Sequence, residues 1–269
     1  MSLKRKSNME DILKSGSIKF IIGSEKTEFT VHSMSIATLS QALHSLVSTG
    51  RPGVVVKSVT WSNVETSTFV NLMEYAYSKD YSTPELTKTD EAVEAISLHT
   101  WMLGISQEDE SPQKSSAQYR FCQQHFSPNT TASDGAITES SFATEAWLKD
   151  IQQQHLTGYE TVFRTHTNLY ILADRWRIAD LNDLCLRKIR LTLIHAPRTK
   201  ELFIALFLTI PTVYNNTFDN DPLRSLLVRY CISSMACIMG QEGDNRMAPL
   251  LRRLPHFAAD LLLKMPHDY

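Results

Sequence analysis

Glycine is scarce in this sequence, and no glycine-rich loop for phosphate binding is present. The 269 residues include 9 glycines, and no stretch matches G-x-x-x-x-G-K-[ST] or G-x-G-x-x-G. The G-x-S-x-G turn that exposes the serine nucleophile of α/β-hydrolases is also missing. Because nucleotide sites of these kinds depend on close backbone approach, the sequence predicts neither such a site nor a hydrolase of that fold.

Cysteine and histidine are not spaced as metal ligands. The 4 cysteines form no C-x-x-C pair, and the 9 histidines include no H-E-x-x-H or H-x-H. We therefore expect no structural zinc, no other metal and no cofactor. The cysteines are interpreted as reduced thiols, mostly packed as small apolar side chains: Cys122, Cys185, Cys231 and Cys237.

Long apolar runs and an excess of one charge are absent as well. A net charge of −2 gives no basic field for nucleic acid. The longest apolar run, Leu202–Ile210, is far shorter than a membrane span and predicts a buried helix. The N-terminal residues lack the apolar stretch of a signal peptide, so we expect an intracellular protein, cytoplasmic or nuclear, without a membrane anchor. The basic run Lys4–Lys6 is either part of a nuclear address or a solvated end.

Strand signals open the first zone of the chain, residues 11–80. The runs Ile18–Gly23 and Glu28–His32 are rich in β-branched and aromatic residues and predict a hairpin. A third strand is predicted at Val54–Val59, after a Gly/Pro turn.

A helix is predicted to follow these strands. Ser62 and Glu65 match a capping box, in which each side chain satisfies a free N–H group of the first turn. Apolar residues then recur at helical spacing, which indicates one packed face: Phe69, Leu72, Met73, Ala76 and Tyr77.

The second zone, residues 82–157, is rich in Ser, Thr, Gln and Asn. Such a composition buries too little apolar surface to offset the entropy of ordering, so residues 105–140 are predicted to be largely disordered. Short helices are possible at 89–103 and 142–154.

The acidic run Glu108–Glu110 is interpreted as solvated loop charge rather than a metal site. Ser111 and Ser127 each precede a proline and are candidates for proline-directed phosphorylation.

The third zone, from Gly158 to the end, is predicted to be helical. Two apolar stripes flank a corner near residues 176–180: Tyr159, Val162, Phe163, His166, Leu169, Tyr170 and Ala173, then Leu181, Leu184, Cys185 and Ile189. Asp221 followed by Pro222 is a strong helix start, with the carboxylate as N-cap and proline in the first turn. An amphipathic piece at Phe257–Met265 closes the chain.

His32 stands where the second strand meets a helix, between Val31 and Ser33. With Ser33 or Ser35 it is the one arrangement that suggests a nucleophile and a base. Catalytic partners usually meet across a fold and not through sequence adjacency, so a structural role for His32 is the favoured interpretation. A hydrolase that uses His32 with a distant serine remains the alternative.

Three segments together resemble the BTB/POZ family. The first runs from Leu13 to Leu43 and carries an entry turn, a hairpin and a strand-to-helix passage. The second is the "FVNLMEYAYSKDY" helix, and the third is "LYILADRWRIADLNDLCLRKI". The matching positions are Gly16, Phe29, Val31, His32, Ile36, Ser40 and Leu43; Phe69, Tyr75, Tyr77 and Tyr81; and Tyr170, Leu172, Ala173, Asp174, Ile178, Leu181 and Cys185.

The fungal members of that family are the most similar, because they carry a low-complexity insertion and a helical tail like "VYNNTFDNDPLRSLLVRY". The resemblance implies an α+β fold, with a small sheet capped by helices and followed by an all-helical C-terminal extension. The implied boundaries are 1–81 for the first part, 82–157 for the insertion, 158–193 for the closing helices and 194–269 for the extension.

The resemblance implies protein–protein interaction without catalysis, as a scaffold or adaptor that can form homodimers. A cullin-3 adaptor is the alternative, but "ALHSLVSTG" lacks the glutamate of the apolar-x-Glu element and makes cullin binding doubtful. The protein partner is otherwise unidentified. We expect partner contacts on the helix around Ile36–Leu46 and on the segment Met9–Leu13. The candidate residues are Ile12, Leu13, Ile36, Leu39, Leu43 and Leu46.

Overall fold

A computed structural model describes residues 9–48, 58–88, 117–126, 156–235, 238 and 247–266. The chain forms two compact units. Unit 1 comprises Met1–Thr83 and Asn168–Cys185, and unit 2 comprises Pro84–Thr167 and Leu186–Tyr269. A small mixed sheet with helices comes first and a mostly helical region follows, so the predicted α+β class is confirmed.

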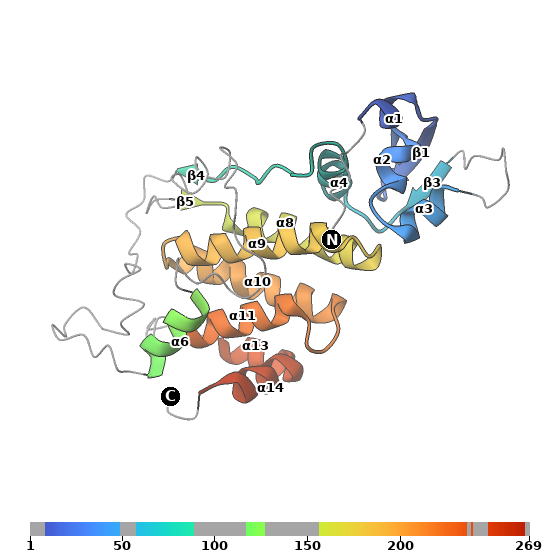
Figure 1. Ribbon diagram of the computed structural model, residues 1–269. Coiled ribbons are helices and arrows are strands. Elements are labelled where there is room, and N and C mark those ends of the chain that lie inside the picture. Colours follow the sequence, from blue (N-terminus) through green and yellow to red (C-terminus); the bar gives the residue numbers. More distant parts are fainter. Residues whose placement is uncertain are drawn as a thin grey trace. The chain divides into compact units, whose positions relative to one another are not determined.

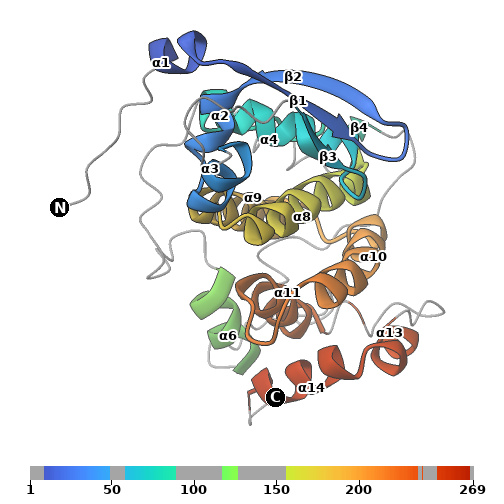
Figure 2. The same cartoon turned by 90° about the vertical axis from the view of Figure 1, so that its right-hand side faces the viewer.

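The sheet of unit 1 is built on the predicted hairpin, which is confirmed (Figure 2). Strand β1 (Ser17–Ile22) pairs antiparallel with β2 (Thr27–His32), and β3 (Ser58–Trp61) runs parallel to β1, in the order β2-β1-β3. Alternate residues of β1 are buried, as the period of a strand requires. The third strand lies later than the predicted Val54–Val59, and residues 54–57 are outside the described part.

Helix α4 (Thr66–Ser78) packs most of its predicted apolar face inward. Phe69, Leu72, Met73 and Ala76 are buried, whereas Tyr77 is half-buried. The rings of Phe20 and Phe69 lie 5.1 Å apart, and Trp61 meets Phe20 at the same distance. The predicted capping box is wrong. Ser62 is not the N-cap of α4, because it lies in a turn in which the Val64 N–H donates to the Trp61 carbonyl at 3.4 Å. The N-cap is Glu65, whose side chain makes no capping hydrogen bond.

Three short helices flank the hairpin: α1 (Met9–Lys14), α2 (Ser33–Ala37) and α3 (Gln41–Val47). The start of α2 is tied to the end of α1. The Ser33 N–H donates to the Gly16 carbonyl at 2.7 Å, and the Met34 N–H donates to the Ser15 hydroxyl at 3.2 Å. Ser40 caps α3 by accepting from the Leu43 N–H at 3.1 Å.

Two long helices, α8 (Tyr159–Arg175) and α9 (Ala179–His195), run through both units of the chain. The turn between them belongs to unit 1 and contains Arg177 with a φ of 54°. In the same unit Trp176 stacks on Trp61 with ring centroids 5.1 Å apart. The apolar stripe predicted for Tyr159–Ala173 is confirmed, because all seven of its members are buried.

Unit 2 contains a short pair of strands and a stack of helices (Figure 1). Strands β4 (Thr87–Lys88) and β5 (Leu156–Thr157) are antiparallel. The later helices are α10 (Lys200–Asn216), α11 (Pro222–Ser233), α13 (Met247–Arg253) and α14 (Pro255–Lys264). The predicted buried helix at Leu202–Ile210 and the predicted helix start at Asp221 are confirmed. Of the helices in the described part of the chain, none combines the length and apolar content that crossing a membrane requires.

Helix α6 (Ala117–Phe126) lies inside the stretch for which disorder is predicted, so that prediction is wrong for these ten residues. Phe121, Cys122 and Phe126 are buried, and the helix packs on α11. Docking of this apolar face supplies the burial that the surrounding polar composition lacks. The helices predicted at 89–103 and 142–154, and most of the predicted disordered stretch, lie outside the described residues.

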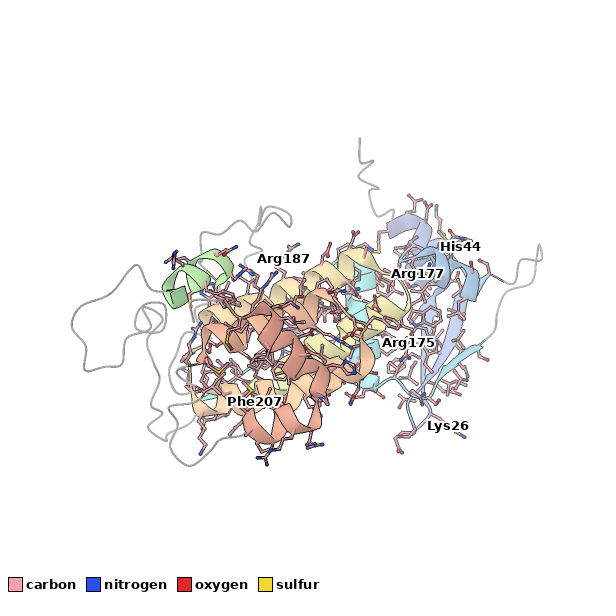
Figure 3. The ribbon with its side chains drawn as sticks, turned by 90° about the horizontal axis from the view of Figure 1, so that it is seen from below. Lys26, His44, Arg175, Arg177, Arg187 and Phe207 are labelled. Carbon is pink, nitrogen blue, oxygen red and sulfur yellow. The ribbon has the colours of Figure 1, made fainter. Side chains whose placement is uncertain are left out.

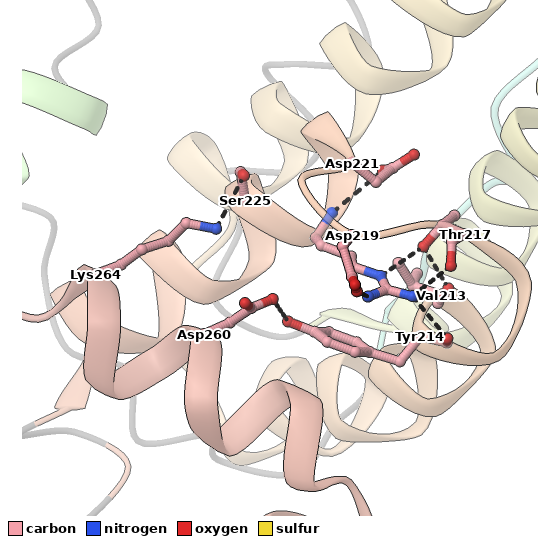
Figure 4. Close-up of polar contacts among 9 residues, drawn as sticks. Val213, Tyr214, Thr217, Asp219, Asp221, Ser225, Asp260 and Lys264 are labelled. Carbon is pink, nitrogen blue, oxygen red and sulfur yellow. Dashed lines mark hydrogen bonds and ion pairs between the residues drawn. The ribbon is translucent and has the colours of Figure 1, made fainter.

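A buried arginine closes the end of α10 (Figure 4). The guanidinium of Arg224 donates to the Tyr214 carbonyl at 3.0 Å, to the Thr217 carbonyl and, through Nε, to the Thr217 hydroxyl at 2.9 Å. It also pairs with the exposed Asp219 carboxylate at 2.8 Å. These donors satisfy carbonyls that the last turn of a helix leaves free, so Arg224 holds α11 to the end of α10.

Candidate interaction surface

Helices α1 and α2 of unit 1 present three large apolar side chains to solvent. Met9 and Leu13 on α1 are 42% and 59% exposed, and Met34 on α2 is 37% exposed. Exposed apolar side chains that gather on neighbouring elements are typical of sites that bind another protein. We call Met9, Leu13 and Met34 the α1–α2 surface.

The local sequence explains why α1 presents this face. Ile12 is buried and anchors the helix, while Met9 and Leu13 are four residues apart and share the other side. The Ser15 hydroxyl donates to the Ile12 carbonyl at 2.7 Å and accepts the Met34 N–H at 3.2 Å. This serine fixes the end of α1 against the first turn of α2, so the apolar side chains are held on an ordered support.

The predicted contact residues divide between the surface and the interior. Leu13 is exposed, and Leu39 and Leu46 are partly exposed. Ile12, Ile36 and Leu43 are buried, and their assignment to a contact surface is corrected. Their apolar spacing marks the side of each helix that packs inward. Met34 was not among the predicted contact residues. The sequence feature that could have indicated it is an unbranched apolar residue in the first turn of the helix that follows His32.

The imidazole ring of His32 bonds to helix α4. Its ring nitrogen Nδ1 lies 2.9 Å from the Tyr77 hydroxyl, which also accepts the His32 backbone N–H at 3.3 Å. Ser35 is buried, and its hydroxyl donates to the backbone carbonyl of His32 at 2.7 Å. These bonds connect strand β2 to α4 across 45 residues of sequence, which favours a structural role for the histidine.

The remaining motif residues also meet inside unit 1. The ring of Phe29 lies 5.1 Å from that of Phe69, and the Tyr81 hydroxyl donates to the Cys185 sulfur at 3.4 Å. Burial, assisted by Asp180 and Cys185, raises the pKa of Tyr75 to about 12. The second of the three segments on which the family resemblance depends therefore contacts both of the others within unit 1.

Across the residues that the structure describes, no three His, Cys, Asp or Glu side chains gather in a way that could hold a metal ion. Cys122, Cys185 and Cys231 are free thiols and are buried. No protein-family description matches the sequence, and no curated protein matches it.

Proposed function

We propose that this protein is a non-catalytic protein–protein interaction module of BTB/POZ type, acting as a scaffold or adaptor. The observation that carries the proposal is the α1–α2 surface, where Met9, Leu13 and Met34 remain exposed on helices that are fixed to each other. Burial of such side chains supplies the apolar centre of an interface, and ordered helices reduce the entropy lost on binding.

Contacts within unit 1 support the family assignment. The segments that resemble the BTB/POZ pattern are joined through His32 and Tyr77, through Phe29 and Phe69, and through Tyr81 and Cys185. A family pattern whose members pack together is better explained by a shared fold than by chance matches along the sequence.

A second copy of the chain is the partner we propose for the α1–α2 surface. Sedimentation velocity of the full chain at tens of micromolar tests this proposal, and we expect a dimer. Leu13→Asp introduces a charge into the surface and is expected to weaken the dimer by at least about 10-fold, as for a central apolar contact. Val70→Asp is the matched control, because Val70 is 46% exposed on α4 of the same unit but lies outside the surface.

A monomer at these concentrations would contradict the proposed self-association. An equal effect of Leu13→Asp and Val70→Asp would show that the α1–α2 surface is not the interface.

A cullin-3 adaptor is the second candidate within the same class. Helix α3, which corresponds to the cullin-contacting region of the family, carries no carboxylate. We therefore expect little capture in a pull-down with purified cullin-3, and strong capture would favour the adaptor role.

An intracellular location, in the cytoplasm or nucleus, belongs to the same proposal. The buried free thiols of Cys122, Cys185 and Cys231 are compatible with a reducing compartment.

A further inference from the structure

Four polar side chains lie close together inside unit 2. Burial, with smaller contributions from Tyr230 and Glu201, raises the pKa of the Tyr159 phenol, whereas the positive charge of Arg198 opposes the rise. These three residues are therefore within electrostatic reach of the Tyr159 hydroxyl. The guanidinium of Arg198 also lies 5.8 Å from the centre of the Tyr230 ring. We call Tyr159, Arg198, Glu201 and Tyr230 the polar cluster.

The members of the polar cluster come from separate parts of the helical stack. Tyr159 is the first residue of α8, and Arg198 lies in the connection between α9 and α10. Glu201 is in the first turn of α10, and Tyr230 is on α11. A molecule bound among these side chains would therefore contact several helices at once.

Two oxygen atoms of the polar cluster are buried without a hydrogen-bond partner among the residues that the structure describes. They are the hydroxyl of Tyr159 and Oε2 of Glu201. The side chain of Tyr159 is 1% exposed, so its hydroxyl is shielded from bulk water. Buried polar groups in folded proteins are almost always hydrogen-bonded, either to protein atoms or to ordered water. The two oxygen atoms therefore indicate a bound molecule that reaches both.

The charges of the polar cluster define which kind of molecule fits. Arginine side chains usually stay at the surface, as Arg187 of α9 does (Figure 3). Arg198 is buried instead and donates to the carbonyls of Leu193, Ile194 and Ala196. Its positive charge disfavours a bound cation, and the carboxylate of Glu201 disfavours a bound anion. A small neutral molecule that both donates and accepts hydrogen bonds fits the site, and water has these properties.

We infer that an internal water molecule binds in the polar cluster, where it accepts a hydrogen bond from the Tyr159 hydroxyl and donates one to Oε2 of Glu201. Buried waters typically bond to two to four polar groups, and Arg198 and Tyr230 supply further polar atoms in the cluster. The water satisfies both buried oxygen atoms and links the start of α8 to the start of α10.

Oxygen-17 magnetic relaxation dispersion of water in a solution of the full chain detects long-lived internal waters. Tyr159→Phe keeps the ring and removes the hydroxyl, and we expect the relaxation amplitude to fall by about the contribution of one water. Tyr214→Phe is the matched control, because the Tyr214 hydroxyl donates directly to the Asp260 carboxylate at 2.7 Å. This control should leave the amplitude unchanged.

Urea unfolding measures whether the two oxygen atoms depend on each other. Tyr159→Phe should raise the unfolding equilibrium constant about 5-fold, as for the loss of one hydrogen bond. Glu201→Met removes the acceptor, and Tyr159→Phe should then have little further effect, because the bridge is already lost. Glu160→Met is the matched control, since Glu160 is exposed, and in that background Tyr159→Phe should keep its full effect.

Three results would overturn the inference. If Tyr159→Phe were as stable as wild type or more stable, the hydroxyl would have no partner to lose. If Tyr159→Phe kept its full effect in the Glu201→Met background, the two oxygen atoms would not share a bound molecule. If the two substitutions were coupled but the relaxation amplitude stayed unchanged in Tyr159→Phe, the side chains would bond directly, without water.

Discussion

Replacement of Arg224 by methionine is the most direct test of how unit 2 is held together. The side chain of Arg224 is buried and donates to two carbonyls, those of Tyr214 and Thr217, at the end of α10. Arg224→Met fills a similar volume but has no donor. The two carbonyls then lose the donor that Arg224 supplies.

The expected loss follows from these two acceptors. A buried carbonyl that loses its partner costs about 1–3 kcal/mol, so two of them lower the unfolding free energy by about 3 kcal/mol. The ring of Tyr214, whose centre lies 4.5 Å from the guanidinium, loses a cation–π contact in addition. The ion pair with Asp219 contributes little, since that carboxylate is exposed. Asp219→Asn is therefore expected to cost less than about 1 kcal/mol.

Urea unfolding followed by circular dichroism measures these differences. Arg229→Met is the matched control, because Arg229 is on the same helix but exposed, and we expect a change within about 0.5 kcal/mol. The reasoning is refuted if Arg224→Met is as stable as wild type, or if Arg229→Met is destabilised by the same amount.

Two further predictions concern histidines. His32→Ala should lower the unfolding free energy by about 1–3 kcal/mol, because the Tyr77 hydroxyl loses its bond to Nδ1. Tyr77→Phe should have a similar effect, and a thermal melt of each variant measures it. If His32→Ala instead abolished a hydrolytic activity and left stability intact, the catalytic alternative would be supported. His166 is fully buried, and burial, then Lys188, lower its pKa to about 3, so the neutral ring is favoured in the folded state. Its contribution to stability is present above pH 6.5 and is lost as pH falls toward 3, by about 1.4 kcal/mol per pH unit. Urea titrations at pH 7, 6 and 5 should show a weaker pH dependence for His166→Gln than for wild type, and identical slopes would contradict this account.

The sequence determined those features that depend on local pattern. The runs rich in β-branched and aromatic residues before and after Gly23 predict the hairpin, because such side chains suit a pleated surface, and the structure contains it. The helical spacing from Tyr159 to Ala173 predicts a buried stripe, which the structure also contains. Asp221 and Pro222 mark the start of α11, since both act on the backbone of the same turn.

Local pattern alone could not separate an interface from the core. Ile36 and Leu43 have the spacing expected for a partner surface, but the same spacing places them in the interior of unit 1. The exposed Met34 was overlooked because exposure depends on which neighbours cover a side chain. The predicted capping box at Ser62 failed for a related reason, since the chain turns back after β3 and delays the helix until Thr66.

Only the tertiary structure decided where the buried charges lie. Arginine side chains are usually placed at the surface, yet Arg198 and Arg224 are both buried. Arg198 donates to the carbonyls of Leu193, Ile194 and Ala196 at the end of α9, as Arg224 does at the end of α10. The physical reason is that the last carbonyls of a helix need donors when neighbouring helices exclude water from them. The sequence by itself therefore determined the hairpin, several helices and their apolar faces, whereas tertiary packing decided the order of α6, which faces stay exposed and which polar groups are buried.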